Sequence, residues 1–243
     1  MCFSKKASFL MAVCGAISSV IIYKNMNSYS AFCVFYFTLM QIIHYFGYTV
    51  INNCKNKINQ NMSILNYYHI CFQAPVWLLG WYGVFKKYKI ISNSQLEFMP
   101  MLIGMSLVVS FFMVLQRYDW PIGPKTKNSS VNSEKEGALK GKLCSYSGKK
   151  HIKFRLPLRT EPKYYSPGVS GHFIFFFIPL LFFNNTTRFI ALFTWVTGLV
   201  LPTLYYKLNE TEAATVWCYL SITQLLVMYF YIMYKYSSNS TLD

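Results

Sequence analysis

Acidic residues are scarce in this chain, and charged residues of either sign are few. Only 8 of the 243 residues are Asp or Glu, and charged residues make up 13% of the chain, against about 25% in an average soluble domain. Amphipathic helices of the kind found in soluble proteins are also missing. The long apolar runs are apolar almost all round and have no polar face. These shortages exclude an ordinary soluble globular domain.

Apolar residues take the place of the missing charge, since 54% of the chain is hydrophobic and 19% is aromatic. A helix needs roughly 20 apolar residues to cross about 30 Å of hydrocarbon. The sequence therefore predicts an all-α, multi-pass membrane protein, a single membrane domain over residues 1–243 with lipid as its partner. We expect Pro75 to kink the third helix. The seven runs that predict helices are residues 7–23, 31–51, 64–85, 98–115, 168–183, 189–206 and 211–234.

Basic residues give the chain a net charge of +15, and they lie in its loops. Such an excess would favour a nucleic-acid partner in a soluble protein, but none is expected for loops between membrane helices. Seven helices place 17 Lys and Arg on the side of the N-terminus and 6 on the other, and residues 117–163 hold twelve of the 17. Because cytoplasmic loops collect Lys and Arg, we predict a cytoplasmic N-terminus and an outside C-terminus. Residues 116–167 then form a basic cytoplasmic loop that separates four helices from three.

The basic loop divides into two parts by composition. Residues 125–142 are rich in Ser, Asn, Lys and Glu, which is typical of a disordered linker. Residues 148–155 alternate polar and apolar side chains, which indicates a short strand or an interfacial segment. We expect residues 144–172 to be structured and to cover a polar cavity. The candidates for binding a lipid headgroup or another anion are Lys149, Lys150, His151 and Arg155, although a basic loop can also do no more than fix topology.

Seven cysteines occur in the chain, and no two of them form a CxxC pair. Most fall inside apolar runs, where a free cysteine behaves as a small hydrophobic residue. We therefore expect neither a disulfide framework nor a thiolate zinc site.

Polar side chains gather near the predicted cytoplasmic face, and they are the candidates for a cavity: His44, His69, His172, Glu212, Gln41 and Gln73. Ionisable groups inside a membrane are costly and usually face the interior of the helix bundle. Two interpretations stay open. Histidine and carboxylate side chains could bind Zn²⁺, with His69, His172 and Glu212 as ligands, although no HxxxH or HExxH spacing is present. Alternatively, the same side chains form hydrogen bonds between helices.

The sequence predicts a membrane protein of unassigned activity, and the sharper hypothesis for a cavity of this kind is a membrane hydrolase or transferase that acts on a lipid. A bound metal would lower the pKa of its water and supply the nucleophile. The alternative is a non-catalytic transporter, channel or membrane-organising protein, which would need a polar path through all the helices. The sequence identifies no catalytic residue.

Four stretches carry a resemblance to a known family: residues 1–8 (MCFSKKAS), 35–40 (FYFTLM), 68–73 (YHICFQ) and 212–218 (EAATVWC). In them the chain resembles an uncharacterised family of multi-pass membrane proteins with an MCxSxxAS-like opening, found in bacteria, some eukaryotes and large DNA viruses. The resemblance implies an integral membrane protein and supplies no activity. The family pattern leads us to expect a carboxylate in the second helix, where this chain has Gln41. That difference argues against an acid–base role at this position.

Overall fold

The computed structural model describes residues 4–115, 143–156, 167–207 and 210–237. Within these ranges the side chains of residues 167–173, 210–211, 214 and 237 are not described. The predicted linker at residues 125–142 lies outside the described residues. The described chain is mostly helical, as the sequence predicts, with one short β-hairpin.

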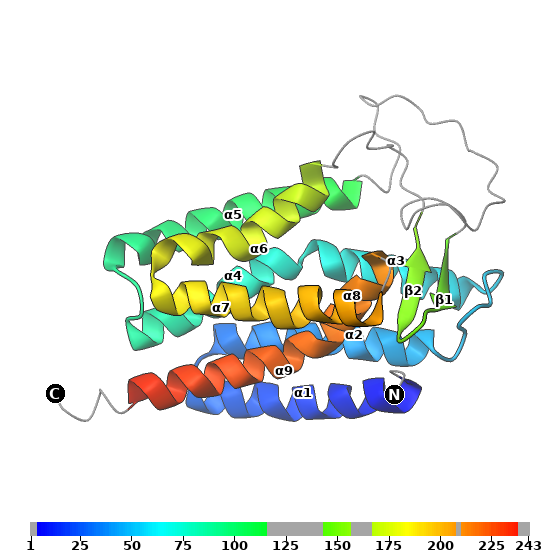
Figure 1. Ribbon diagram of the computed structural model, residues 1–243, viewed down its shortest axis with the longest axis horizontal. Helices are drawn as coiled ribbons and strands as arrows, with labels where there is room; N and C mark the ends of the chain where they lie inside the picture. Colours follow the sequence, from blue (N-terminus) through cyan, green and yellow to red (C-terminus); the bar gives the residue numbers. More distant parts are fainter. Residues whose placement is uncertain (1–3, 116–142, 157–166, 208–209, 238–243) are drawn as a thin grey trace.

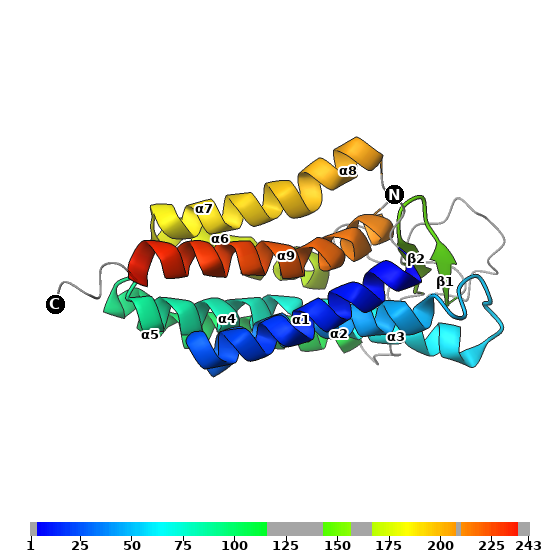
Figure 2. The same cartoon turned by 90° about the horizontal axis from the view of Figure 1, so that it is seen from below.

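The helices lie side by side and run alternately between two ends of an elongated bundle (Figures 1 and 2). We call the two ends the hairpin end, which carries the β-hairpin and the starts of α1 and α9, and the opposite end, which carries the turns after α1, α4 and α6. The helices are α1 (Lys5–Asn25), α2 (Ser28–Gly47), α3 (Lys57–Cys71), α4 (Gln73–Tyr88), α5 (Asn93–Leu115), α6 (Pro167–Phe183), α7 (Asn185–Trp195), α8 (Leu201–Tyr206) and α9 (Glu210–Ser237), with a π-helical turn, Val196–Val200, between α7 and α8.

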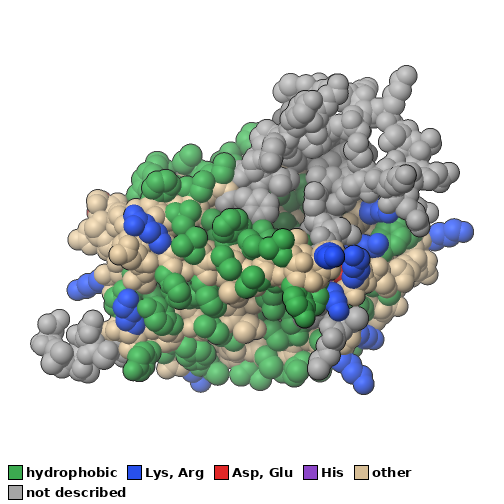
Figure 3. Space-filling model, in the orientation of Figure 1, with side chains coloured by type: hydrophobic (Ala, Val, Ile, Leu, Met, Phe, Trp, Pro, Cys, Tyr) green, Lys and Arg blue, Asp and Glu red, His purple; other side chains and the backbone are tan. Residues whose placement is uncertain are grey.

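Five helical segments of the described chain are long and apolar enough to cross a membrane. Large apolar side chains on them point outward, for example Leu10, Phe112 and Phe230, each more than half exposed. Figure 3 shows hydrophobic side chains over the length of the bundle and Lys and Arg side chains near its two ends. Together with the five long apolar segments, this distribution suggests a membrane location for the chain. The five segments are Lys5–Asn25, Ser28–Gly47, Asn93–Leu115, Asn185–Tyr206 and Thr215–Tyr236.

The third predicted helix is broken at Phe72, where α3 ends and α4 begins. Pro75 has no N–H for the carbonyl of Cys71, four residues earlier, and its ring would clash with that carbonyl in a regular helix. The break lies between these two residues, so the predicted kink is confirmed.

The helices approach one another closely where small residues meet. A Cβ atom on Gly15 of α1 would overlap the side chain of Thr38 on α2, and one on Gly80 of α4 would overlap Cys33. Aromatic side chains fill the space between the more distant helices, as in the stacked pair Trp77 and Phe176, whose ring centroids are 4.7 Å apart. Small residues at helix contacts and large ones between them are typical of membrane bundles.

The β-hairpin consists of β1 (Cys144–Ser147) and β2 (Ile152–Arg155), paired antiparallel. The alternating pattern at residues 148–155 predicts a strand, and the structure confirms it for β2, where the alternate residues Ile152 and Phe154 are buried. Residues 148–151 form the turn instead. Figure 2 shows the hairpin at the end of the bundle, next to α3 and the start of α9.

Candidate functional site beneath the hairpin

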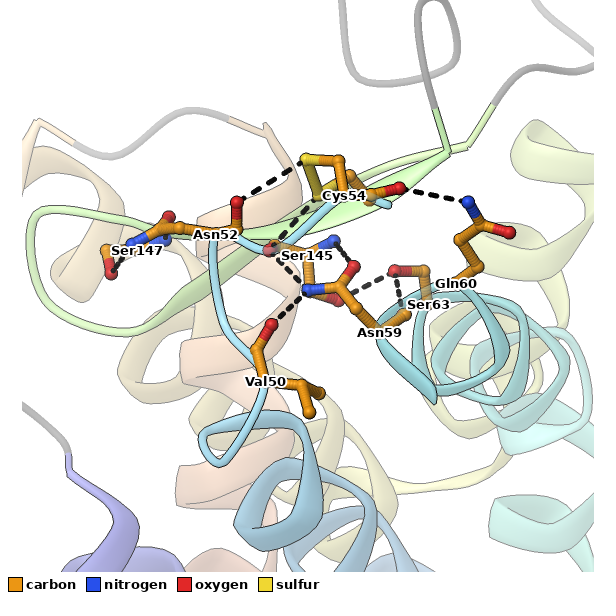
Figure 4. The surroundings of a disulfide bond; sticks show 9 residues. Val50, Asn52, Cys54, Asn59, Gln60, Ser63, Ser145 and Ser147 are labelled. Atoms are coloured by element: carbon orange, nitrogen blue, oxygen red, sulfur yellow. Dashed lines mark hydrogen bonds between the residues drawn. A yellow bond between two sulfur atoms is a disulfide. The ribbon is translucent and has the colours of Figure 1, made fainter. Parts of the chain in front are cut away.

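A disulfide bond between Cys54 and Cys144 fixes β1 to the loop between α2 and α3 (Figure 4). The prediction that no disulfide forms is therefore wrong for these two residues. It holds for Cys14, Cys33, Cys71 and Cys218, which lie within helices as free thiols. The two bonded residues are 90 positions apart, so no short sequence motif indicates that they pair.

Side-chain amides reinforce the same attachment. Asn59 accepts a hydrogen bond from the backbone N–H of Ser145 at 2.8 Å and donates to the carbonyl of Ser145 at 3.0 Å. The Asn59 amide thus pairs with β1 as another strand would. Asn52, which adopts a left-handed conformation with φ of 65°, accepts from the N–H of Ser147 at 2.9 Å. Figure 4 shows these side chains meeting at β1.

The turn of the hairpin is attached to α9. The carboxylate of Glu212, which is buried, accepts hydrogen bonds from the backbone N–H groups of Lys150 and His151. The hydroxyl of Thr215, one turn further along α9, donates to the carbonyl of Ile152. Glu212 therefore orients the hairpin. A Cβ atom at Gly148 would overlap this carboxylate, which explains why the turn has a glycine there.

His151 points from the turn into the bundle and is buried. Its Nδ1 atom lies 2.8 Å from the hydroxyl of Tyr48, in a hydrogen bond whose direction depends on the tautomer. Burial lowers the pKa of the His151 imidazole to about 3, so the ring is neutral at pH 7. His151 accordingly offers a base or a hydrogen-bonding group, and not a cation for an anionic headgroup.

His44 on α2 lies directly beneath His151. The two ring centroids are 4.6 Å apart, with the rings nearly perpendicular. His44 is fully buried, and neither ring nitrogen has a hydrogen-bond partner among the described residues. A buried polar group without a partner costs about 1–3 kcal/mol, so each such group calls for an explanation. A buried water molecule or a ligand that hydrogen-bonds to this imidazole would satisfy it.

Two further polar atoms at this level lack a hydrogen-bond partner within the described part of the chain. One is Oε1 of Gln41, one turn from His44 on α2, and the other is the hydroxyl of Ser8 on α1. The contacts of Gly15 with Thr38 and of Phe9 with Tyr45 set the antiparallel register of α1 and α2. This register places Ser8 level with Tyr45, next to His44 in the chain.

His69 lies elsewhere, and its hydrogen bonds are made. Its Nε2 atom donates to the carbonyl of Tyr36 at 2.7 Å, and its Nδ1 atom accepts from the side chain of Gln73 at 3.4 Å. The ring also stacks on Tyr36, with centroids 4.2 Å apart. His69 and Gln73 therefore match the structural interpretation, in which polar side chains join helices.

The basic candidates of the hairpin separate from His151. Lys149 is exposed and donates to the carbonyl of Lys207 at 3.3 Å. The ammonium group of Lys150 lies over the ring of Tyr206, and the guanidinium of Arg155 lies over the ring of Tyr146. These three side chains cover the outer surface of the hairpin, whereas His151 faces inward.

The structure describes the side chains of two of the three predicted zinc ligands, His69 and Glu212. In the described ranges, no three His, Cys, Asp or Glu side chains are grouped so that they could hold a metal ion. His69 and Glu212 are engaged with Tyr36 and the hairpin, respectively. His172 belongs to α6, but its side chain is not described, so a site that includes it stays a prediction.

The sequence does not predict a role for several residues of this region. Tyr48 and Asn59 carry no charge and belong to no recognised motif, and Cys54 and Cys144 were grouped with the helical cysteines. One signal could have separated the last two, since both lie outside the apolar runs.

The family model that matches the chain is that of a family of unknown function (DUF5765), over residues 6–237. The chain belongs to this family. The resemblance seen in the sequence is thereby confirmed as membership of an uncharacterised family. No curated protein and no solved structure matches the chain. The function of this DUF5765 chain must therefore be argued from its own residues.

Proposed function

We propose that this DUF5765 protein crosses the membrane seven times and carries out lipid chemistry at its hairpin end. Five crossings are the long apolar segments. The other two are α3 with α4 and the short α6, which run between the same two ends in Figure 1. The activity that we favour is that of a membrane-embedded hydrolase or transferase whose substrate is a lipid.

One observation carries this proposal, namely the buried imidazole of His44 with no hydrogen-bond partner, set against the ring of His151. A neutral imidazole, the form that accepts a proton, is the most common general base in enzymes. Ser8 and Gln41 add a hydroxyl and an amide oxygen at the same level. In such an arrangement His44 activates a hydroxyl group or a water molecule, and Gln41 orients it.

The depth of the polar residues favours such a site over a transport path. Among the described residues, every buried His, Asn, Gln and Glu lies in the hairpin half or near the middle of its helix. On α9 the polar residues reach Gln224, which donates to Thr197 at 2.6 Å. The buried residues beyond it are Leu225, Met228, Tyr229 and Ile232. A transporter or channel, the alternative predicted from the sequence, would need a continuous polar path through this second half too, where the buried polar side chains of the described residues are hydroxyls such as those of Ser19, Ser30 and Thr187.

The test is turnover of lipids by the purified protein in vesicles that contain a panel of headgroups, with products identified by mass spectrometry. We expect His44→Gln to lower turnover by about 10²–10⁴-fold, the usual contribution of a general base. His69→Gln is the matched control, a buried histidine whose replacement keeps a hydrogen-bonding amide and should leave turnover within a few-fold. Lack of turnover of any lipid, or full activity of His44→Gln, would overturn the proposal.

A further inference from the structure

The disulfide bond between Cys54 and Cys144 has a consequence for how the protein sits in its membrane. Its two residues are the cysteines of the described chain that lie outside helices, both at the hairpin end. Cys144 is buried and Cys54 is half-buried. The noncovalent contacts of Asn59 and Asn52 with β1 hold the two backbone segments together independently of the sulfur atoms. Folding therefore brings the thiols side by side, and oxidation can then join them.

The chemistry of the bond decides the compartment. Formation of the disulfide oxidises two thiols, releases two protons and passes two electrons to an acceptor. A disulfide-bearing oxidoreductase is the acceptor class that accepts them, and it becomes a dithiol. Such partners act in oxidising compartments, whereas the cytosol keeps thiols reduced. We infer that the hairpin end of the protein faces an oxidising compartment, with the start of α1 outside the cytosol and the end of α9 in the cytosol.

This orientation is the reverse of the one that the positive charges predict. The charge argument depends on a single segment, because without residues 117–163 the two sides carry 5 and 6 Lys and Arg. Cys144 belongs to that same segment. The charge rule describes a statistical bias of insertion, whereas a disulfide requires an oxidant. For this reason we give the disulfide the greater weight.

The orientation also specifies the substrate, a step that rests on the proposed function. The polar site around His44 lies three residues from the end of α2 at the hairpin end. Its substrate would then be a lipid of the leaflet that faces the oxidising compartment. Headgroups of the cytosolic leaflet would be out of reach, since the buried His, Asn, Gln and Glu side chains of the described residues stop at mid-depth.

The experiment uses the full chain in sealed microsomal vesicles, with an epitope tag at either the N-terminus or the C-terminus. Protease added outside, on the cytosolic face, should remove the C-terminal tag and leave the N-terminal tag intact. Chain isolated from the same vesicles after alkylation of free thiols should yield a peptide pair joined through Cys54 and Cys144. Cys14→Ser should give the same result, because Cys14 is free and exposed.

Loss of the N-terminal tag with protection of the C-terminal tag would overturn the inference, and so would alkylation of both Cys54 and Cys144. Cys54→Ser separates folding from oxidation, since tag protection in this variant reports orientation without the bond. The results of the protease and alkylation experiments do not depend on the proposed enzymatic activity. Lipid turnover can be measured in vesicles of mixed orientation, so failure of the proposed function and failure of this inference are distinguishable.

Discussion

The two ends of the bundle are closed in different ways. The opposite end is closed by helix caps and short turns: Asn184 caps α7 through a reciprocal capping box with Thr187 and also donates to the carbonyl of Ile90 at 2.7 Å. The hairpin end is closed by a separate β-hairpin that a disulfide and buried side chains hold in place. Helix caps and hydrogen bonds between neighbouring turns thus close one end, while a disulfide-linked hairpin closes the other.

The difference also separates what each end can do. Behind the caps of the opposite end lies an aromatic and aliphatic core, in which Trp81 meets Tyr229 with ring centroids 5.2 Å apart. Behind the hairpin lie His151, His44 and Gln41. Among the described residues, unpartnered buried polar atoms occur in both halves, but those of the opposite half belong to Asn27, Trp81 and Tyr229, whereas the hairpin half has an imidazole, that of His44, and an ionisable group inside a membrane is costly. The function that we propose lies at the hairpin end, whereas the packed core of the opposite end stabilises the bundle.

The largest effect should come from removal of the disulfide. Cys144→Ser opens a covalent loop of about 90 residues, and a loop of this size constrains the unfolded chain by about 4 kcal/mol in the entropy model. We expect a lower melting temperature for the variant and for reduced wild-type protein, as measured by thermal unfolding in detergent.

The matched control for the disulfide is Cys14→Ser, which replaces an exposed free thiol and should unfold as the wild type does. Equal melting temperatures for Cys144→Ser and wild type would show that the noncovalent contacts alone close the hairpin end.

Asn59 and Asn184 compare the two ends directly. Asn59→Ala removes three hydrogen bonds, to Val50 and to both backbone groups of the buried Ser145, and leaves polar groups unpaired at about 1 kcal/mol or more each. We expect a loss of about 3 kcal/mol, against about 2 kcal/mol for Asn184→Ala, which removes a helix cap and the hydrogen bond to Ile90. Hydrogen exchange at β1 should rise only in the first variant.

The conservative variant Asn59→Asp retains the acceptor for the N–H of Ser145 but not the donors. The stability that it loses should therefore lie between the losses for Asn184→Ala and Asn59→Ala. If Asn184→Ala proves more destabilising than Asn59→Ala, the description of the opposite end as closed by local caps is wrong.

The same contrast explains how much of the molecule the sequence predicts. Helices follow from runs of apolar residues, and the break before Pro75 follows from the geometry of one ring. The alternation around Ile152 likewise predicts β2. Each of these features depends on residues that are close together in the chain, so each can be predicted from the sequence.

The site could be predicted only in part, because its details depend on contacts between distant residues. The sequence groups His44, His69 and Glu212 by depth alone, whereas the helix faces separate them into a residue without partners, a hydrogen-bonded structural residue and a support for the hairpin. The pairing of Cys54 with Cys144 and of Asn59 with Ser145 is set by tertiary structure. Neither pairing has a signature in composition or spacing.

Acidification should weaken the hairpin end through His151. Its folded pKa is lowered to about 3 from 6.5, so between these values the unfolded chain binds more protons than the folded chain. The free energy of unfolding should therefore fall as pH drops below 6.5, by about 1.4 kcal/mol per unit and about 2 kcal/mol at pH 5. The groups that face His151 are His44, Tyr48 and Tyr219.

Melting curves of wild type and His151→Gln between pH 5 and pH 8 provide the measurement. The variant should be less sensitive to acid, so the difference in stability between the two proteins should shrink as pH falls. Parallel curves would mean that His151 is not the group whose protonation matters.

The smallest effect should come from the basic outer surface of the hairpin. Lys149 and Lys150 belong to the turn of the hairpin, where Lys149 is exposed and Lys150 half-buried, and a Lys near an anionic membrane surface contributes about 1 kcal/mol, or about five-fold in affinity. In nanodiscs of mixed anionic and zwitterionic lipid, Lys149→Ala should reduce the enrichment of anionic lipid around the protein by about this factor. Lys24→Ala, at the opposite end, is the control. The hairpin gathers Lys149, Lys150, Lys153 and Arg155 within seven residues. Lys24→Ala should therefore reduce the enrichment of anionic lipid less than Lys149→Ala does.

Equal reductions by the two variants would show that these charges act as general membrane anchors and do not belong to a headgroup site.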